Sequence, residues 1–162
     1  MAKVVILMAS GRDMGFASSI GRFLEGFGVD FDYRVASAHK TPERVLEILK
    51  SYGERGEDIV YITVAGRSNA LSGMVDANTR FPVIAAPILK EGREILDIFS
   101  SLRMPSGVAP LVVLGAENAA LAAIKILALK DESLAEKVEA YQEGKKGEVE
   151  DADKSFRERM IG

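Results

Sequence analysis

Apolar residues along the chain follow two patterns, short strand-like runs and repeats at intervals of three and four. The first run, residues 3–9, is rich in β-branched side chains, which is typical of a strand buried on both faces. Comparable runs, one of them alternating, predict further strands at residues 28–37, 58–65, 81–87 and 109–115. Repeats with helical spacing predict helices at residues 16–27, 42–52, 68–79, 92–102 and 116–130.

Strand and helix alternate five times, and this order predicts the fold. Strands that alternate with helices form a parallel sheet, and right-handed crossovers place the helices on both of its faces. We therefore predict an α/β domain over residues 1–130, a flavodoxin-like three-layer sandwich with a parallel five-stranded sheet. The length of 162 residues suits one domain with a substantial core.

The C-terminal part of the chain, residues 131–162, has a different pattern, which predicts a helical extension. Its first eleven residues align three apolar side chains at helical spacing: Leu134, Val138 and Tyr141. From residue 142 the sequence is strongly charged, yet three apolar residues recur at intervals of seven and four: Val149, Phe156 and Met160. This segment is either a frayed, solvated tail or an amphipathic helix that packs on the domain or on a neighbouring subunit.

The helix predicted at residues 116–129 is apolar nearly all round, apart from Glu117, Asn118 and Lys125. A helix without a polar face is usually buried. In so small a domain this favours a subunit interface, and hence a homo-oligomer. The alternative is a central helix that the chain's own tail covers.

Composition and charge narrow the classes of function. The net charge of −3 argues against a nucleic-acid partner, which requires a basic surface. Without cysteine there are no disulfides, thiolate nucleophiles or Cys-ligated metals, and a single histidine argues against a His-based zinc site. The N-terminus lacks a leader's cleavage site, and no apolar run is long enough for a membrane span. We expect a cytoplasmic protein with no membrane partner.

Three loops that leave the first three predicted strands are candidates for a ligand site: residues 9–13, 37–41 and 65–69. In an open parallel sheet, ligands bind outside the carboxyl ends of the strands. Each loop carries a serine and a cation and leads into a predicted helix, a combination that suits a phosphate. None of them matches the glycine-rich fingerprint of dinucleotide-binding proteins or the P-loop.

Each polar residue of these loops also has an ordinary interpretation. The serines Ser10, Ser37 and Ser68 suit helix caps, and the cations Lys40 and Arg67 suit solvated surface charges. Thr41 suits the N-cap of the helix that Pro42 opens, and Asp13 either starts its helix or binds a ribose diol. His39, the only histidine, is either an ordinary strand-end residue or the chemical centre of the site. Convergence of the three loops in one crevice favours the functional interpretation.

Four segments then stand out as a set: MASGRDM, SAHKTPE, AGRSNALSGMVDA and SSLRMPSGVAPLVVLGAENAALAAIKILAL. In order and spacing they resemble the phosphoribosylaminoimidazole carboxylase catalytic subunit family of purine biosynthesis, and the resemblance covers residues 4–129. Class I members are mutases that move a carboxyl group from N5-carboxyaminoimidazole ribonucleotide to the ring carbon. Class II members carboxylate aminoimidazole ribonucleotide directly with CO2.

The resemblance favours class II. Mutases typically read SAHR in the second loop, where this chain has Lys40 as the fourth residue. They also have a longer third loop with a second histidine, and Ala70 falls at that position here. The resemblance thus implies reversible carboxylation of 5-aminoimidazole ribonucleotide at C4 by CO2, without ATP, biotin, metal or any other cofactor. A class I mutase is the first alternative, and a non-catalytic flavodoxin-like module that binds a phosphorylated ligand is the second.

The resemblance also implies roles for individual residues. His39 matches the residue that transfers the proton. Four residues match positions that bind the phosphate and ribose of the nucleotide: Ser10, Asp13, Ser37 and Lys40. Gly66 and Ser68 lie in the loop that lines the pocket for the carboxyl group or CO2, whereas Arg67 has no assigned role. The family forms homo-oligomers around its central helices, so a tetramer or octamer is expected.

Overall fold

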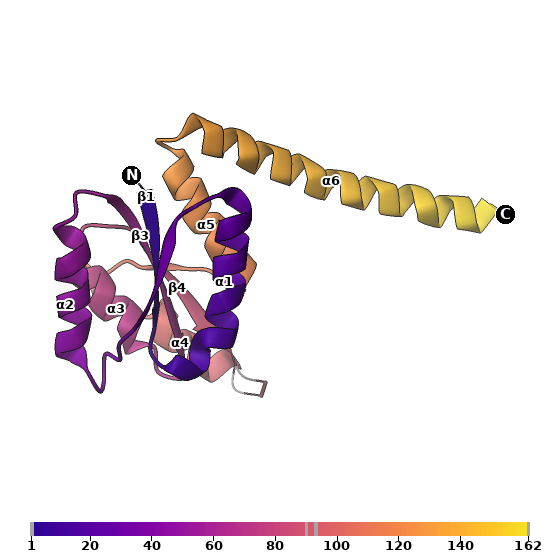
Figure 1. The fold of residues 1–162 in the computed structure, drawn as a ribbon. Helices are drawn as coiled ribbons and strands as arrows, with labels where there is room; N and C mark the ends of the chain where they lie inside the picture. The colour runs from indigo at the N-terminus through magenta and orange to yellow at the C-terminus, as the bar shows by residue number, and fades with distance from the viewer. Residues whose placement is uncertain (1, 90, 93, 162) are drawn as a thin grey trace.

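The structure is a computed structural model that describes residues 2–89, 91–92 and 94–161. Its centre is a five-stranded, all-parallel sheet with the strand order β2-β1-β3-β4-β5 (Figure 1). The strands are β1 (Ala2–Met8), β2 (Phe31–Val35), β3 (Asp58–Gly66), β4 (Val83–Ile88) and β5 (Leu111–Val112). This is the strand order of flavodoxin-like folds, so the predicted fold class is confirmed.

Helices cover both faces of the sheet (Figure 1). They are α1 (Met14–Phe27), α2 (Pro42–Gly53), α3 (Ala70–Ala77), α4 (Glu94–Leu102), α5 (Ala116–Ala128) and α6 (Glu132–Ile161), and a short 3-10 helix, η1 (Gly11–Asp13), precedes α1. Helices α1 and α5 pack on one face, and α2 and α3 on the other. The predicted strand at residues 109–115 is shorter in the structure, and Arg93 of the fourth predicted helix lies outside the described residues.

Strand β1 explains why the chain begins with a continuous apolar run. Val4 and Ile6 point into the core beneath α1 and α5, whereas Val5 and Leu7 point into the core beneath α2 and α3. All four side chains are fully buried. A strand between two helical layers has no solvent-facing side, so no polar alternation is expected.

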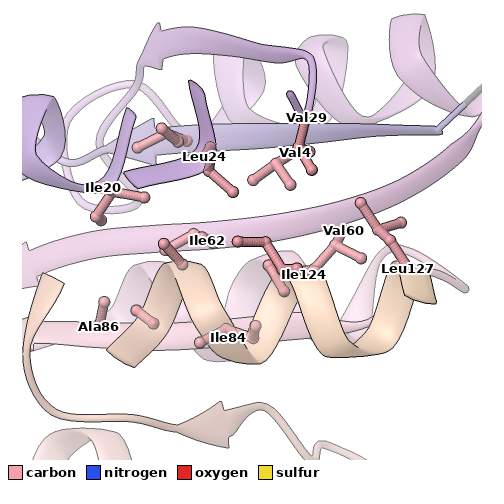
Figure 2. Packing of buried hydrophobic residues seen from close by; sticks show 14 of the residues in the cluster. Val4, Ile20, Leu24, Val29, Val60, Ile62, Ile84, Ala86, Ile124 and Leu127 are labelled. Atoms are coloured by element: carbon pink, nitrogen blue, oxygen red, sulfur yellow. The ribbon is translucent and has the colours of Figure 1, made fainter. Parts of the chain in front are cut away.

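Helix α5 is buried largely within its own chain. Figure 2 shows Ile124 and Leu127 directed at the strands that carry Val60, Ile62 and Ile84. The small alanines of α5 allow close packing against the sheet and against α1, and the first turns of α6 join the same cluster. This packing already accounts for the apolar character of residues 116–129, and the subunit interface stays a prediction.

Helix α6 runs without interruption from Glu132 to Ile161 and projects beyond the domain (Figure 1). Its first turns bury Leu134 and Val138 in the core. From Gln142 to Met160 every residue except Gly147 is exposed, including three apolar side chains at 65–88% exposure: Val149, Phe156 and Met160. None of the described helices combines the length and apolar character that a membrane crossing requires.

Candidate functional site

The carboxyl ends of β1, β2 and β3 lie at one level of the sheet. Met8, near the end of β1, pairs with Val35 on one side and with Val64 on the other. The backbone ladder continues one step past β1, because Ala9 donates to Val64 at 2.9 Å and Ala36 donates to Met8 at 3.0 Å. The three loops singled out in the sequence therefore leave the sheet side by side, as the fold prediction requires.

The first loop is shaped by Ser10. Its Oγ accepts a hydrogen bond from the backbone of Arg12 at 3.2 Å, and its carbonyl accepts one from the backbone of Asp13 at 3.1 Å. These bonds form η1, the short 3-10 helix that the sequence pattern did not predict. Asp13 lies at the junction with α1 and is half-buried, so its carboxylate stands at the amino end of that helix.

The second loop is a compact turn closed by Ser37 and Thr41. The Thr41 backbone donates to the Ser37 carbonyl at 2.8 Å, and the Ser37 backbone donates to the Thr41 hydroxyl at 2.9 Å. Thr41 occupies the N-cap position of α2, but its hydroxyl makes no capping bond to the helix, because Ser37 engages it. His39 and Lys40 lie at the exposed tip of this turn.

The third loop differs from the sequence interpretation in its helix cap. Asn69, rather than Ser68, caps α3, and its side chain accepts a hydrogen bond from the Ser72 backbone at 3.1 Å. Arg67 adopts a left-handed conformation with φ of 54°. Ser68 consequently stays outside the helix and is exposed. A Cβ atom at Gly66 would lie 3.4 Å from the Ile88 carbonyl oxygen, at the limit of ordinary van der Waals contact.

A buried polar network behind the third loop was missed in the sequence. Asn69 and Ser72 are both fully buried or nearly so, and they bond to residues of β3 and α4: Thr63, Ser100 and Ser101. Asn69 before an apolar helical pattern is a recognisable cap signal. The serines of α4 lie about thirty residues away in sequence, so no local pattern indicates their contact with this loop.

The arrangement suits an anionic, phosphorylated ligand. Helices α1, α2 and α3 all begin at this edge, so their free backbone N–H groups and positive dipole ends face the same region. The loops add three exposed cations: Arg12, Lys40 and Arg67. His39 is exposed beside them and is able to reach a bound molecule.

In a single chain the edge is open to solvent. Cavities of about 420 and 460 Å³ lie instead near the amino ends of the strands. Their lining residues include Ala2 and Phe81, and none of them belongs to the three loops. The convergence of backbone dipoles, cations and the histidine, rather than a deep hollow, therefore marks the candidate site.

Comparison with known proteins identifies the family of the chain. Residues 3–148 match the family model described as AIRC, AIR carboxylase. The chain is 57% identical over 155 residues to a phosphoribosylaminoimidazole carboxylase of Archaeoglobus fulgidus, a match that covers 96% of this chain and 85% of the relative. It is 40% identical over 158 residues to an N5-carboxyaminoimidazole ribonucleotide mutase of Methanocaldococcus jannaschii, with 96% and 98% covered.

The fold is shared with a solved relative as well. The crystal structure of Treponema denticola PurE matches with a TM-score of 0.93 and 43% identity, covering 96% of this chain and 98% of that one. The family resemblance seen in the four sequence segments is thereby confirmed. From its own residues and from these matches, the chain belongs to the AIR carboxylase family of enzymes.

Proposed function

We propose that this enzyme carboxylates 5-aminoimidazole ribonucleotide at C4 directly with CO2, as class II members do, and that the reaction is reversible. The short third loop carries the proposal. Only Arg67 and Ser68 separate the end of β3 from the cap of α3 at Asn69. Ala70, the first residue of α3, falls where mutases have a second histidine, and it offers no group that titrates. The 57% identity to a relative named as a carboxylase supports the same branch.

The chemistry needs few protein groups. The imidazole ring of the substrate is an electron-rich enamine, so the C4 electron pair forms the new bond to the carbon of CO2. The adduct still carries its hydrogen at C4, and a general base removes that proton to restore aromaticity. In reverse, the same group protonates C4 and the C–C bond breaks to release CO2. The reaction written in this way requires no ATP, biotin or metal.

His39 is the residue that we assign to the proton transfer. Histidine is the side chain that exchanges protons most readily near neutral pH. His39 stands exposed on the second loop, which leaves the edge strand β2 beside β1, and the resemblance matches it to the residue that transfers the proton. General acid–base catalysis contributes typically about 10²- to 10⁴-fold, and positioning within a water-excluding site supplies the rest.

The nucleotide is held by the first two loops in this proposal. The phosphate and ribose contact Ser10, Asp13, Ser37 and Lys40, all of which lie at or beside the amino ends of α1 and α2. The positive helix ends and the Lys40 ammonium favour the phosphate, and the Asp13 carboxylate accepts hydrogen bonds from ribose hydroxyls. Gly66 and Ser68 of the third loop line the CO2 pocket.

We also propose that the enzyme works in the cytoplasm as a tetramer or octamer. Besides the apolar residues of α6, the chain exposes Ile95, Leu96 and Phe99 on α4 at 51–77%. Exposed apolar patches of this kind mark interaction surfaces in soluble proteins. Packing between subunits also closes the open edge that a single chain leaves around His39.

A class I mutase is the second candidate, because the match to a relative named as a mutase reaches 40% identity over nearly the whole chain. The two activities differ in substrate. An ATP-free assay with aminoimidazole ribonucleotide in bicarbonate buffer, following 4-carboxyaminoimidazole ribonucleotide, separates them from each other. A parallel reaction starts from the N5-carbamate in the presence of a scavenger for released CO2.

Product from the first mixture that disappears when CO2 is removed supports the direct carboxylase. Product only from the carbamate assigns the chain to the mutase branch instead. The third possibility, a module that only binds the nucleotide, requires tight ligand binding with no product in either mixture. Each outcome therefore selects one of the three functions.

A further inference from the structure

The hydroxyl of Ser100, on α4, holds the peptide groups on both sides of Ser68. Its Oγ lies 3.0 Å from the carbonyl oxygen of Arg67, to which it donates, and it accepts from the backbone N–H of Asn69 at 2.9 Å. These two groups belong to the peptide bonds that flank Ser68. The single hydroxyl proton of Ser100 is shared between the Arg67 carbonyl and the carbonyl of Asp97 in its own helix, which lies 2.8 Å from the Oγ.

Ser101 anchors the same loop from inside. Its Oγ accepts a hydrogen bond from the Asn69 side-chain amide at 2.9 Å, and both residues are about 1% exposed. The side-chain Oδ1 of Asn69 accepts from the backbone N–H and from the hydroxyl of Ser72 at 3.1 and 2.9 Å. The loop is thus tied to α4 through two main-chain contacts at Ser100 and one side-chain contact at Ser101.

Capping of α3 alone does not explain these bonds. An N-cap asparagine satisfies a backbone N–H of its own helix with its side-chain oxygen, and Asn69 does so with Ser72. The contacts from Ser100 and Ser101 come from residues of α4 that follow 31 to 33 positions later, and they reach the backbone of Arg67 as well as the backbone and side chain of Asn69. These hydrogen bonds therefore set the position of the third loop relative to α4, in addition to the capping bond that starts α3.

The loop is also strained, so it needs such support. Among the described residues other than glycine, Arg67 alone has a positive φ, at 54°. A left-handed conformation is unfavourable for a residue with a side chain and persists where surrounding contacts determine it. The Arg67 carbonyl is the group that Ser100 engages, so this hydrogen bond opposes relaxation of the strained residue.

We propose that Ser100 is a positioning residue for the reaction, which it serves by holding the Ser68 backbone at the CO2 side of the active site. The inference rests on the proposed function, because it assigns the third loop to CO2. Ser100 touches neither substrate nor reacting atoms; it acts through the peptide groups around Ser68. Its loss therefore weakens use of CO2 while the nucleotide, held by the first two loops, binds as before.

The test compares three variants with the unaltered full-length enzyme: Ser100→Ala, Ser100→Thr and, as a control, Ser51→Ala at an exposed serine on α2. Steady-state kinetics vary CO2 and aminoimidazole ribonucleotide separately, and thermal unfolding monitors the fold. A small displacement near the reacting atoms costs up to about 100-fold, so we expect Ser100→Ala to lower kcat/KM for CO2 roughly 10- to 100-fold. The KM for the nucleotide stays within about twofold of the unaltered enzyme's, as an intact first and second loop requires.

Threonine keeps the hydroxyl, and position 100 is only half-buried, so Ser100→Thr should recover most of the activity. The proposal is overturned if Ser100→Ala matches Ser51→Ala in kcat/KM for CO2. It is overturned too if Ser100→Thr is no more active than Ser100→Ala. The same holds if Ser100→Ala lowers kcat/KM equally for CO2 and for the nucleotide while the melting temperature falls.

The unaltered enzyme is assayed first, so that failure of the proposed function can be told apart from failure of the Ser100 proposal. If it turns over only the N5-carbamate, the direct carboxylation is refuted, and the same variants are then compared by their kcat on the carbamate. A drop in kcat with Ser100→Ala and recovery with threonine still supports the positioning role in that case. No turnover of either substrate refutes the proposed function and the inference together.

Discussion

The ring of Tyr141 packs edge-on against the ring of Phe23, with centroids 5.5 Å apart and an interplanar angle of 86°. The same ring meets Phe27 at 5.6 Å and 65°. This aromatic cluster joins α6 to α1, and past it the helix projects from the domain (Figure 1). Helix α6 therefore has an anchored start and an exposed remainder, which call for separate experiments.

Replacing the anchor should destabilise the fold. Tyr141→Ala removes two aromatic contacts at a half-buried site, so we expect the free energy of unfolding to fall by about 1–3 kcal/mol. Urea denaturation measures the change. Lys146→Ala, at an exposed position one turn further along α6, should stay within about 0.5 kcal/mol of the unaltered protein. Equal effects of the two substitutions would mean that Tyr141 does not anchor the helix.

The exposed remainder of α6 should affect assembly instead. A variant with serine at Val149, Phe156 and Met160 removes the apolar stripe but leaves the anchored turns intact. If the stripe packs on a neighbouring subunit, the mass by light scattering should fall below that of the unaltered assembly, while the helical circular dichroism persists. Glu150→Ser on the same exposed segment is the control. An unchanged mass would favour a solvated tail.

Asp32 should make stability depend on pH. Burial alone raises the pKa of this carboxyl, but hydrogen bonds from Tyr52 and Lys3, with the charges of Lys3 and Arg55, outweigh burial and lower its pKa below the ordinary 3.8. The ionised form is therefore favoured by folding. Its contribution is fully present above the ordinary pKa and disappears as the pH falls through the lowered one.

We expect Asp32→Asn to cost about 1 kcal/mol at pH 7, because the Asp32 side chain is still one-third exposed and solvent screens its ion pairs. The difference from the unaltered protein should begin to shrink as the pH falls below the ordinary pKa of 3.8 and approach zero below the lowered pKa, where both chains carry a neutral group. Denaturation curves at several pH values measure it. Asp30→Asn, at a nearby exposed carboxylate, is the control. A difference that stays constant with pH would contradict the assigned ionisation.

The fold was predictable from sequence where burial dominates. Strand β1 has apolar residues on both of its faces, so its pattern is unambiguous. At the sheet edge the pattern misleads, because β5 pairs only through Leu111 and Val112 although the apolar run is longer. Leu111 and Leu114 are about half exposed, so hydrophobicity there does not report strand pairing.

The meeting of the three loops at one edge of the sheet was predictable from sequence, but the hydrogen bonds that support the third loop were not. The three loops follow from strand order alone, whereas the cap at Asn69 competes in sequence with the adjacent Ser68, and either residue type caps helices. Contacts from Ser100 and Ser101 depend on how α4 packs beside α3. Such tertiary hydrogen bonds leave no periodic signal in the chain.

Helix α1 approaches strand β2 closely at Gly21. A Cβ atom there would overlap the Tyr33 side chain and lie 2.9 Å from the Phe31 ring. We expect Gly21→Ala to lower the free energy of unfolding by about 1–3 kcal/mol, despite the better helix propensity of alanine. Gly26→Ala is a matched control in the same helix, where nothing lies within 4 Å of the new atom, and it should stabilise by about 0.5–1 kcal/mol. If both Gly21→Ala and Gly26→Ala stabilised the protein, strand β2 would have to move to accommodate the methyl group added at Gly21.

The assignment of His39 predicts a loss of chemistry without a loss of binding. The side chain is exposed, so His39→Asn should unfold at the same temperature as the unaltered enzyme. Without its general base, turnover should fall by about 10²- to 10⁴-fold, while the dissociation constant for aminoimidazole ribonucleotide by calorimetry changes little. Lys40→Gln is the contrasting variant on the same loop, because loss of a phosphate contact raises KM for the nucleotide and spares kcat. Near-normal turnover in His39→Asn would remove this histidine from the mechanism and leave the carboxylation without a base on the three loops.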